Sequence, residues 1–147
     1  MVGEIHVEAY SFSQQYFVTM TVPEVWLFGN PDLPVDSLPL RLLPQLQTEF
    51  PAVKFIIQDP LEEWPDREKL IIVDTVAGLE DIKVFTALDD FAESPKLTMH
   101  DFDLKTELSL RDKLGKLPPF VIIGLPSHYD ESKALAELKP LLGQYLK

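Results

Sequence analysis

The sequence has 147 residues, of which 24 are Asp or Glu and 13 are Lys or Arg, and its formal net charge is −11. This excess of acid argues against a protein that binds nucleic acid or an anionic membrane surface, because affinity for phosphate groups comes mainly from Lys and Arg. The absence of cysteine excludes disulfides, thiolate nucleophiles and iron–sulfur clusters. The length and the 46% of hydrophobic residues predict one globular domain, 1–147, with a core of its own.

Two further absences concern the membrane. No apolar run approaches the roughly 20 residues that a spanning helix needs. Residues 1–4 lack the positive charges with which a signal peptide begins. We therefore expect a soluble, cytoplasmic protein with no membrane and no nucleic-acid partner, and we expect a monomer.

The first 23 residues alternate polar and apolar positions in two runs, 6–10 and 16–20, which a polar stretch separates. This alternation predicts a hairpin of two strands on the edge of a sheet. A second interpretation takes Met20 as the biological start, because residues 20–23 lead directly into the first buried strand. The sequence leaves both interpretations open.

Short, continuous apolar runs follow at 25–28, 70–73 and 120–123, with further candidates at 53–57 and 82–85. Continuous runs are typical of strands that are covered on both faces, as in a parallel sheet. Strands of this kind alternate with helical patterns along the chain. The order predicts an α/β fold in three layers, with a mostly parallel, twisted sheet of about five strands flanked by helices.

Three segments between the strands have the apolar spacing of helices. They are residues 38–50, about 104–113 with Gly115 as a C-cap, and 135–145. Pro44 and Pro140 lie inside the first and the last of these patterns. We expect kinks there, because proline removes a helical hydrogen bond.

Polar side chains are expected at the carboxyl ends of the strands, where ligands of open α/β sheets bind. Asp36 stands where the loop after the first buried strand turns into a helix, Asp74 follows the run 70–73, and His100 follows a segment that ends near residues 98–99. Two carboxylates and an imidazole would then meet at one edge of the sheet. Such a donor set suits Ni, Zn, Mn or Co.

Each of these three residues also has a plainer interpretation. Asp36 by itself is more often an N-cap, and His100 by itself is more often a loop or surface histidine. Asp74 differs, because a carboxylate at a buried strand end is costly unless it is paired or bound to a metal. Other arrangements are poorer, since Ser127 and His128 are adjacent and no glycine-rich phosphate loop follows the first buried strand. We expect the acidic pairs to be solvated surface: 62–63, 80–81 and 89–90.

Three segments together resemble those of the hydrogenase maturation proteases, the endopeptidases that finish the large subunit of nickel–iron hydrogenases. The likeness runs from about Val25 to the C-terminus and is specific only when the three are taken jointly. The segments are Val25-Trp26-Leu27-Phe28-Gly29-Asn30-Pro31 with Asp36 at the first helix, Leu70-Ile71-Ile72-Val73-Asp74, and Met99-His100-Asp101-Phe102-Asp103-Leu104.

The resemblance implies a protease-like domain over 24–147, with 1–23 as an N-terminal extension or edge hairpin. In that family an acidic residue of the first loop, an aspartate after a central strand and a histidine bind a metal, which by position implies Asp36, Asp74 and His100. The metal is implied to be nickel already loaded into the hydrogenase large-subunit precursor, with zinc or cadmium as substitutes in vitro. The implied reaction removes the C-terminal extension of that precursor, with Asp36 or Asp74 as the base of an aspartic-type endopeptidase.

The chain departs from the family at the first helix. Members usually carry an acidic pair followed by Gly, an apolar residue and Gly, whereas this chain has Val35-Asp36-Ser37-Leu38-Pro39. Loss of those glycines restricts how closely a substrate backbone can approach. Two other hypotheses therefore stay open. One is a non-catalytic metal-sensing or chaperone-like module that binds a metalloprotein partner, and the other is an interaction domain without a metal site.

Overall fold

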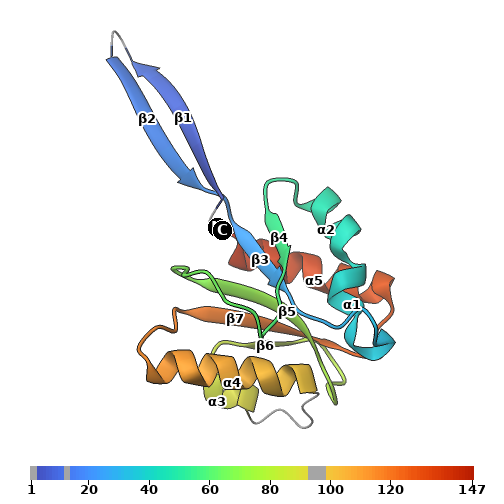
Figure 1. Ribbon diagram of the computed structural model, residues 1–147. Coiled ribbons are helices and arrows are strands. Elements are labelled where there is room, and N and C mark those ends of the chain that lie inside the picture. Colours follow the sequence, from blue (N-terminus) through green and yellow to red (C-terminus); the bar gives the residue numbers. More distant parts are fainter. Residues whose placement is uncertain (1–2, 12–13, 93–98) are drawn as a thin grey trace.

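The computed structural model describes the chain except for residues 1–2, 12–13 and 93–98, and for 4–21, 92 and 99–102 it describes the backbone alone. Its centre is a five-stranded sheet in the order β4-β3-β5-β7-β6 (Figure 1). Four strands are parallel, and β6 at one edge runs antiparallel to β7. The strands are β3 (Glu24–Leu27), β4 (Lys54–Ile57), β5 (Leu70–Val76), β6 (Lys83–Phe85) and β7 (Phe120–Pro126).

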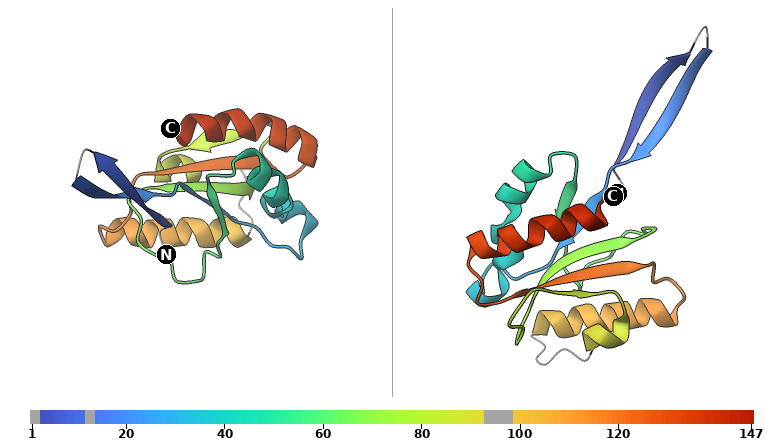
Figure 2. Two further views of the ribbon diagram at one scale, coloured as in Figure 1. Left: turned by 90° about the horizontal axis from the view of Figure 1, so that it is seen from above. Right: turned by 180° about the vertical axis from the view of Figure 1, so that it is seen from behind.

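Helices cover both faces of this sheet, which confirms the predicted three-layer α/β fold (Figures 1 and 2). One face packs against α1 (Leu38–Arg41), α2 (Leu43–Glu49) and α5 (Glu131–Tyr145), and the other against α3 (Leu88–Ala92) and α4 (Met99–Lys113). All seven residues of β5 are buried. Since successive side chains of a strand point to opposite faces, a strand between two helical layers needs apolar side chains at nearly every position.

Prolines divide the first helical segment. Pro39 and Pro44 each stand in the first turn of a short helix, and Leu42 links α1 to α2. The chain therefore breaks its helix instead of bending it at Pro44, because proline is tolerated in a first turn, where its missing N–H has no intrahelical partner. In contrast, α5 continues through Pro140.

The end of α4 agrees with the predicted C-cap. Gly115 has a φ of +68°, a conformation that favours glycine. Its N–H donates to the carbonyl of Asp112 at 3.1 Å, and the next N–H, of Lys116, donates to the carbonyl of Arg111 at 2.8 Å. The start differs, because α4 begins at Met99 and not near Leu104.

The N-terminal hairpin is confirmed, but it is not part of the five-stranded sheet. Strands β1 (Glu4–Ser11) and β2 (Gln14–Thr21) form a separate antiparallel pair that projects from the rest of the molecule (Figure 1). The hairpin leads into β3, which is an interior strand between β4 and β5. The chain before β3 therefore leaves from the amino end of the sheet, where the carbonyl of Pro23 accepts the N–H of Lys54, the first residue of the edge strand β4, at 2.8 Å. Among the described residues, no helix is long and apolar enough to cross a membrane.

Candidate functional site

The carboxyl ends of β3 and β5 lie side by side. Leu27 is in register with Val73, and the N–H of Phe28 continues the pairing by donating to the carbonyl of Val73 at 3.0 Å. The loop that follows β3 and the last residues of β5 therefore share one region, the carboxyl edge of the sheet. This is the location where parallel α/β sheets bind ligands.

Asp74 lies within β5, two residues before its end, so the prediction that it follows the strand is wrong. Strand alternation places it on the same face as Ile72 and Val76, which belong to the core cluster beneath α3 and α4. Its side chain is 1% exposed. The strand continues past Asp74 because β7 pairs with it through Val76, and across that pair Asp74 stands opposite Gly124.

Asp36 is held at the same edge by the loop that follows β3. It ends a short 3-10 helix, η1 (Pro34–Asp36), and its backbone carbonyl accepts a hydrogen bond from the N–H of Asn30 at 2.8 Å. A Cβ atom on Gly29 would lie 2.6 Å from that carbonyl oxygen, so only glycine fits this approach. The Asp36 side chain is 2% exposed. The N-cap of α1 is Ser37, so Asp36 does not take the capping position that the sequence also allowed.

Further hydrogen bonds fix the shape of this loop. The Ser37 hydroxyl donates to the carbonyl of Pro34 at 3.1 Å and accepts from Nε of Arg41 at 3.0 Å. The Asn30 side chain accepts the N–H of Asp32 at 2.9 Å. Ser37 is itself buried. The segment that lacks the glycines of the resembled family is therefore held in one conformation by hydrogen bonds from its own side chains.

His100 lies in the first turn of α4. Its side chain and residues 93–98 of the segment before it are outside the described residues. The helix nevertheless starts toward the carboxyl edge. A short connection joins the end of α4 to the amino end of β7, and the two elements have similar lengths of about 22 Å. The first turn of α4 therefore lies toward the edge that holds Asp36 and Asp74 (Figure 1). Among the side chains that the structure describes, no three His, Asp or Glu residues are grouped to hold a metal ion.

Tyr129 is a residue of this edge that the sequence pattern does not reveal. It follows β7, it is buried, and its hydroxyl donates to Oε1 of Glu137 at 3.2 Å while it accepts the N–H of Ile82 at 3.3 Å. Burial raises the pKa of the Tyr129 phenol, and the neighbouring Glu137 adds to this effect. No motif in the sequence marks such a residue, because its two partners come from separate segments, the chain before β6 and the helix α5. The expected solvated acidic pairs are confirmed as exposed: 62–63, 80–81 and 89–90.

Known structures share this fold. The hydrogenase maturating endopeptidase HybD from E. coli matches with a TM-score of 0.61 and 17% identity over 83% of this chain and 91% of that one. The solution structure of an endopeptidase from Escherichia coli matches with a TM-score of 0.56 and 17% identity over 83% and 90% of the two chains. A protein from Wolinella succinogenes whose function is uncharacterized matches at 0.51, with 15% identity over 84% and 98%.

Sequence comparison adds no family. No protein-family model matches the chain, and no curated protein sequence matches it. At 15–17% identity, the likeness to the solved structures shows the fold: a five-stranded, mostly parallel sheet between helices, as in HybD.

Proposed function

We propose that this chain is an endopeptidase that removes the C-terminal extension of a nickel–iron hydrogenase large-subunit precursor after nickel insertion. The observation that carries the proposal is a pair of buried carboxylates, Asp36 and Asp74, at the carboxyl edge of a sheet that is folded as in HybD. The first turn of α4, with His100, lies toward the same edge. Both solved endopeptidases that resemble the fold support hydrolysis of a peptide bond.

The chemistry of these side chains fits recognition of a nickel ion that the precursor brings. Carboxylate oxygens and an imidazole nitrogen suit nickel, with zinc or cadmium as substitutes. Metal ligands bind in their deprotonated forms, so a cation carried by the substrate would bind Asp36, Asp74 and His100 as two carboxylates and a neutral imidazole. In this way the site inspects the precursor for nickel.

Hydrolysis needs a base as well as a recognition site. Water adds to the carbonyl carbon of the scissile bond, Asp36 or Asp74 accepts its proton, and the proton passes to the nitrogen of the leaving chain as the C–N bond breaks. The products are a new carboxyl terminus on the large subunit and a free peptide. A bound metal would stabilise the negative charge that develops on the carbonyl oxygen.

The test is incubation with a nickel-loaded large-subunit precursor, followed by mass spectrometry of the precursor. We expect loss of the C-terminal extension, and we expect Asp74→Asn to slow it by about 100-fold or more, the range of a lost acid–base group. His100→Ala should slow it as well, because it removes a proposed metal ligand. Asp89→Asn, on the exposed surface of α3, is the matched control and should cleave normally. Circular dichroism of each variant separates loss of the site from loss of the fold.

One observation favours a second candidate, a non-catalytic module that binds the metalloprotein precursor. Ser37, Leu38 and Pro39 are buried in the segment where the resembled family has glycines, and this limits the approach of a substrate backbone. Such a module would bind the nickel-loaded precursor and leave its mass unchanged. Co-purification without cleavage, across several precursors, would refute the endopeptidase and favour the module.

A further inference from the structure

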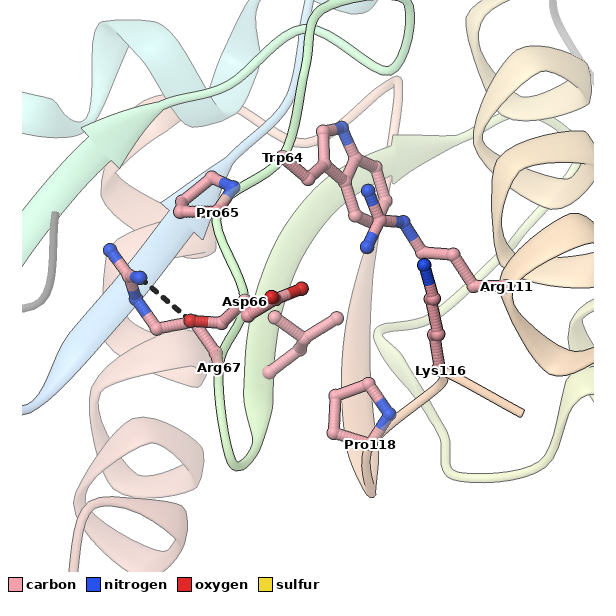
Figure 3. Close-up of a pocket in the computed structure, with 8 residues that line it drawn as sticks. Trp64, Pro65, Asp66, Arg67, Arg111, Lys116 and Pro118 are labelled. Carbon is pink, nitrogen blue, oxygen red and sulfur yellow. Dashed lines mark hydrogen bonds between the residues drawn. The ribbon is translucent and has the colours of Figure 1, made fainter. Parts of the chain in front are cut away.

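A pocket opens at the end of the sheet opposite Asp36 and Asp74. Its volume is about 270 Å³, and it lies between the chain that leads into β5 and the connection from α4 to β7 (Figure 3). Leu70, the first residue of β5, is one of its lining residues. Asp74 stands four residues along β5 from Leu70, so about 13 Å of strand separates the pocket from Asp74. It is thus separate from the site proposed above.

The lining of this pocket is rich in cations, although the whole chain is strongly acidic. Arg67, Arg111 and Lys116 line it, against one carboxylate, Asp66. Arg67 is already neutralised: its Nε and one terminal nitrogen donate to Glu24 at 2.6 and 3.2 Å, with both side chains 8% exposed. Arg67 therefore lines the pocket without offering it a charge. Arg111 is paired through Nε alone, with Glu107, and that pair is more exposed, so Arg111 and Lys116 are the cations that a ligand can reach.

Arg111 and Lys116 are brought together by the C-cap of α4. The N–H of Lys116 donates to the carbonyl of Arg111, so the turn at Gly115 brings the backbone of Lys116 next to that of Arg111. Arg111 uses Nε to bind Glu107 at 2.9 Å, and its guanidinium lies 4.8 Å from the centre of the Trp64 ring. The described part of the chain offers no ion pair to Lys116. In Figure 3 both side chains line the same wall of the pocket, on the side toward which Asp66 extends its carboxylate.

The remaining lining is apolar and fixed. Trp64 is buried, packs edge-on to Trp26 at 5.3 Å, and donates its indole N–H to the carbonyl of Asp59. Leu70 is buried as well, and Pro118 lies two residues before β7 begins. A rigid apolar wall beside two cations favours a ligand that carries both a negative group and an apolar group.

We propose that this pocket binds the carboxyl-terminal residue of a peptide. The terminal carboxylate binds Arg111 and Lys116, the side chain lies against Trp64 and Leu70, and a backbone N–H donates to Asp66. A phosphate group fits less well, because its second negative charge faces Asp66 and gains no donor there. The volume suits one residue, since it is just below the range of about 300–1,000 Å³ of pockets for larger ligands.

Nuclear magnetic resonance of the full chain tests this directly, since its two tryptophans give two indole N–H signals. N-acetyl-leucine is the probe, and N-acetyl-leucinamide is the same molecule without the charge. We expect the acid to shift the indole signal of Trp64 and the amide signal of Lys116 with a millimolar Kd, and the amide probe to shift neither. Lys116→Gln should weaken binding of the acid by at least about fivefold, a typical effect of one lost charge-assisted hydrogen bond.

Two comparisons sharpen the test. Lys113→Gln removes an exposed charge from the same helix end and should leave binding unchanged. Asp66→Asn should allow inorganic phosphate to bind, because the carboxylate that repels it is gone. Equal binding of acid and amide, tighter binding of phosphate than of acid to the unaltered chain, or no shift at all would each overturn the proposal. None of these readouts depends on peptide-bond cleavage, so failure here is distinct from failure of the proposed endopeptidase.

Discussion

Replacing Gly124 with alanine should destabilise the fold from the middle of the sheet. The new Cβ would lie 3.0 Å from Cε2 of Phe85, 3.0 Å from Cγ2 of Val76 and 3.1 Å from Cδ1 of Leu79. Carbon atoms pack best at about 3.5–4.0 Å, so each contact is too short by roughly half an ångström. Phe85 and Val76 are buried and have no solvent to move into.

The expected cost follows from these contacts. Overpacking of a filled core typically lowers the free energy of unfolding by about 1–3 kcal/mol. We expect about 2 kcal/mol here, which corresponds to a fall in Tm of roughly 4–8 °C for a chain of this size. Guanidinium unfolding followed by circular dichroism measures the change, and an unchanged m value would show that the unfolded state is unaffected.

Gly143→Ala is the matched control, because it adds the same methyl group to α5 where no atom lies within 4 Å. It should raise the free energy of unfolding by about 0.5–1 kcal/mol, since alanine is more stable than glycine in the interior of a helix. The two substitutions thus have opposite predicted signs. If Gly124→Ala were as stable as the unaltered chain, the tight packing inferred around Gly124, which stands opposite Asp74, would be refuted.

Three further predictions concern stability. Glu24→Gln leaves the buried Arg67 without its carboxylate partner and should lower the free energy of unfolding by about 3 kcal/mol in guanidinium. Asp130→Ala removes a side-chain oxygen that accepts a backbone N–H in the first turn of α5 at 2.7 Å, and should cost about 1 kcal/mol in the same assay. Burial and Glu137 raise the pKa of Tyr129 in the folded chain above 10.0, so this tyrosine contributes stability below pH 10 that is lost as the pH rises above it. Tyr129→Phe should show a smaller loss of Tm between pH 9 and 11, and an identical alkaline loss in both chains would contradict this.

The sheet could be predicted because its strands are buried on both faces. Residues 70–73 and 120–123 are apolar without interruption, and runs this short and this apolar are typical of strands between two helical layers. Reliance on an unbroken apolar run also puts the predicted end of β5 in the wrong place. Asp74 interrupts the apolar run, so the sequence places it after the strand, whereas pairing with β7 carries the strand through it. Strand ends depend on the partner strand, which a local pattern does not contain.

The start of α4 escapes prediction for a related reason. Residues 99–103 include only two apolar side chains, Met99 and Phe102, too few to mark a helical face, and the longer spacing begins at Leu104. Leu104 and Leu108 enter the core. The local pattern therefore assigns His100 to a loop. The helix α3 gives no signal either, because five residues are too few to show a period.

The sequence points to the two carboxylates of the candidate site but not to the pocket at the other end of the sheet. The sequence marks Asp36 and Asp74 as strand-end carboxylates, and both are buried at one edge of the sheet. The pocket at the other end gives no such signal. Its lining comes from the chain before β5, the end of α4 and the connection to β7, and only the fold brings Trp64, Arg111 and Lys116 together.

The two proposals together constrain the length of the substrate. A precursor whose terminal carboxylate lies beside Lys116 while its scissile bond lies near Asp74 must span at least about 13 Å, the rise of β5 over the four residues from Leu70 to Asp74. An extended chain covers at most about 3.3–3.6 Å per residue, so at least roughly four residues must follow the cleavage point. With such an extension, Lys116→Gln should raise KM several-fold and leave kcat unchanged, because the lost contact is remote from the reacting bond.

Precursors with shorter extensions provide the decisive comparison. A peptide that ends before it can reach the pocket gains nothing from Lys116, so the unaltered chain and Lys116→Gln should cleave it with the same KM. Amidation of the long extension should mimic the substitution, since it removes the charge that Lys116 binds. If Lys116→Gln raised KM equally for short and long extensions, the residue would act on the precursor body, and the pocket would not hold the end of the extension.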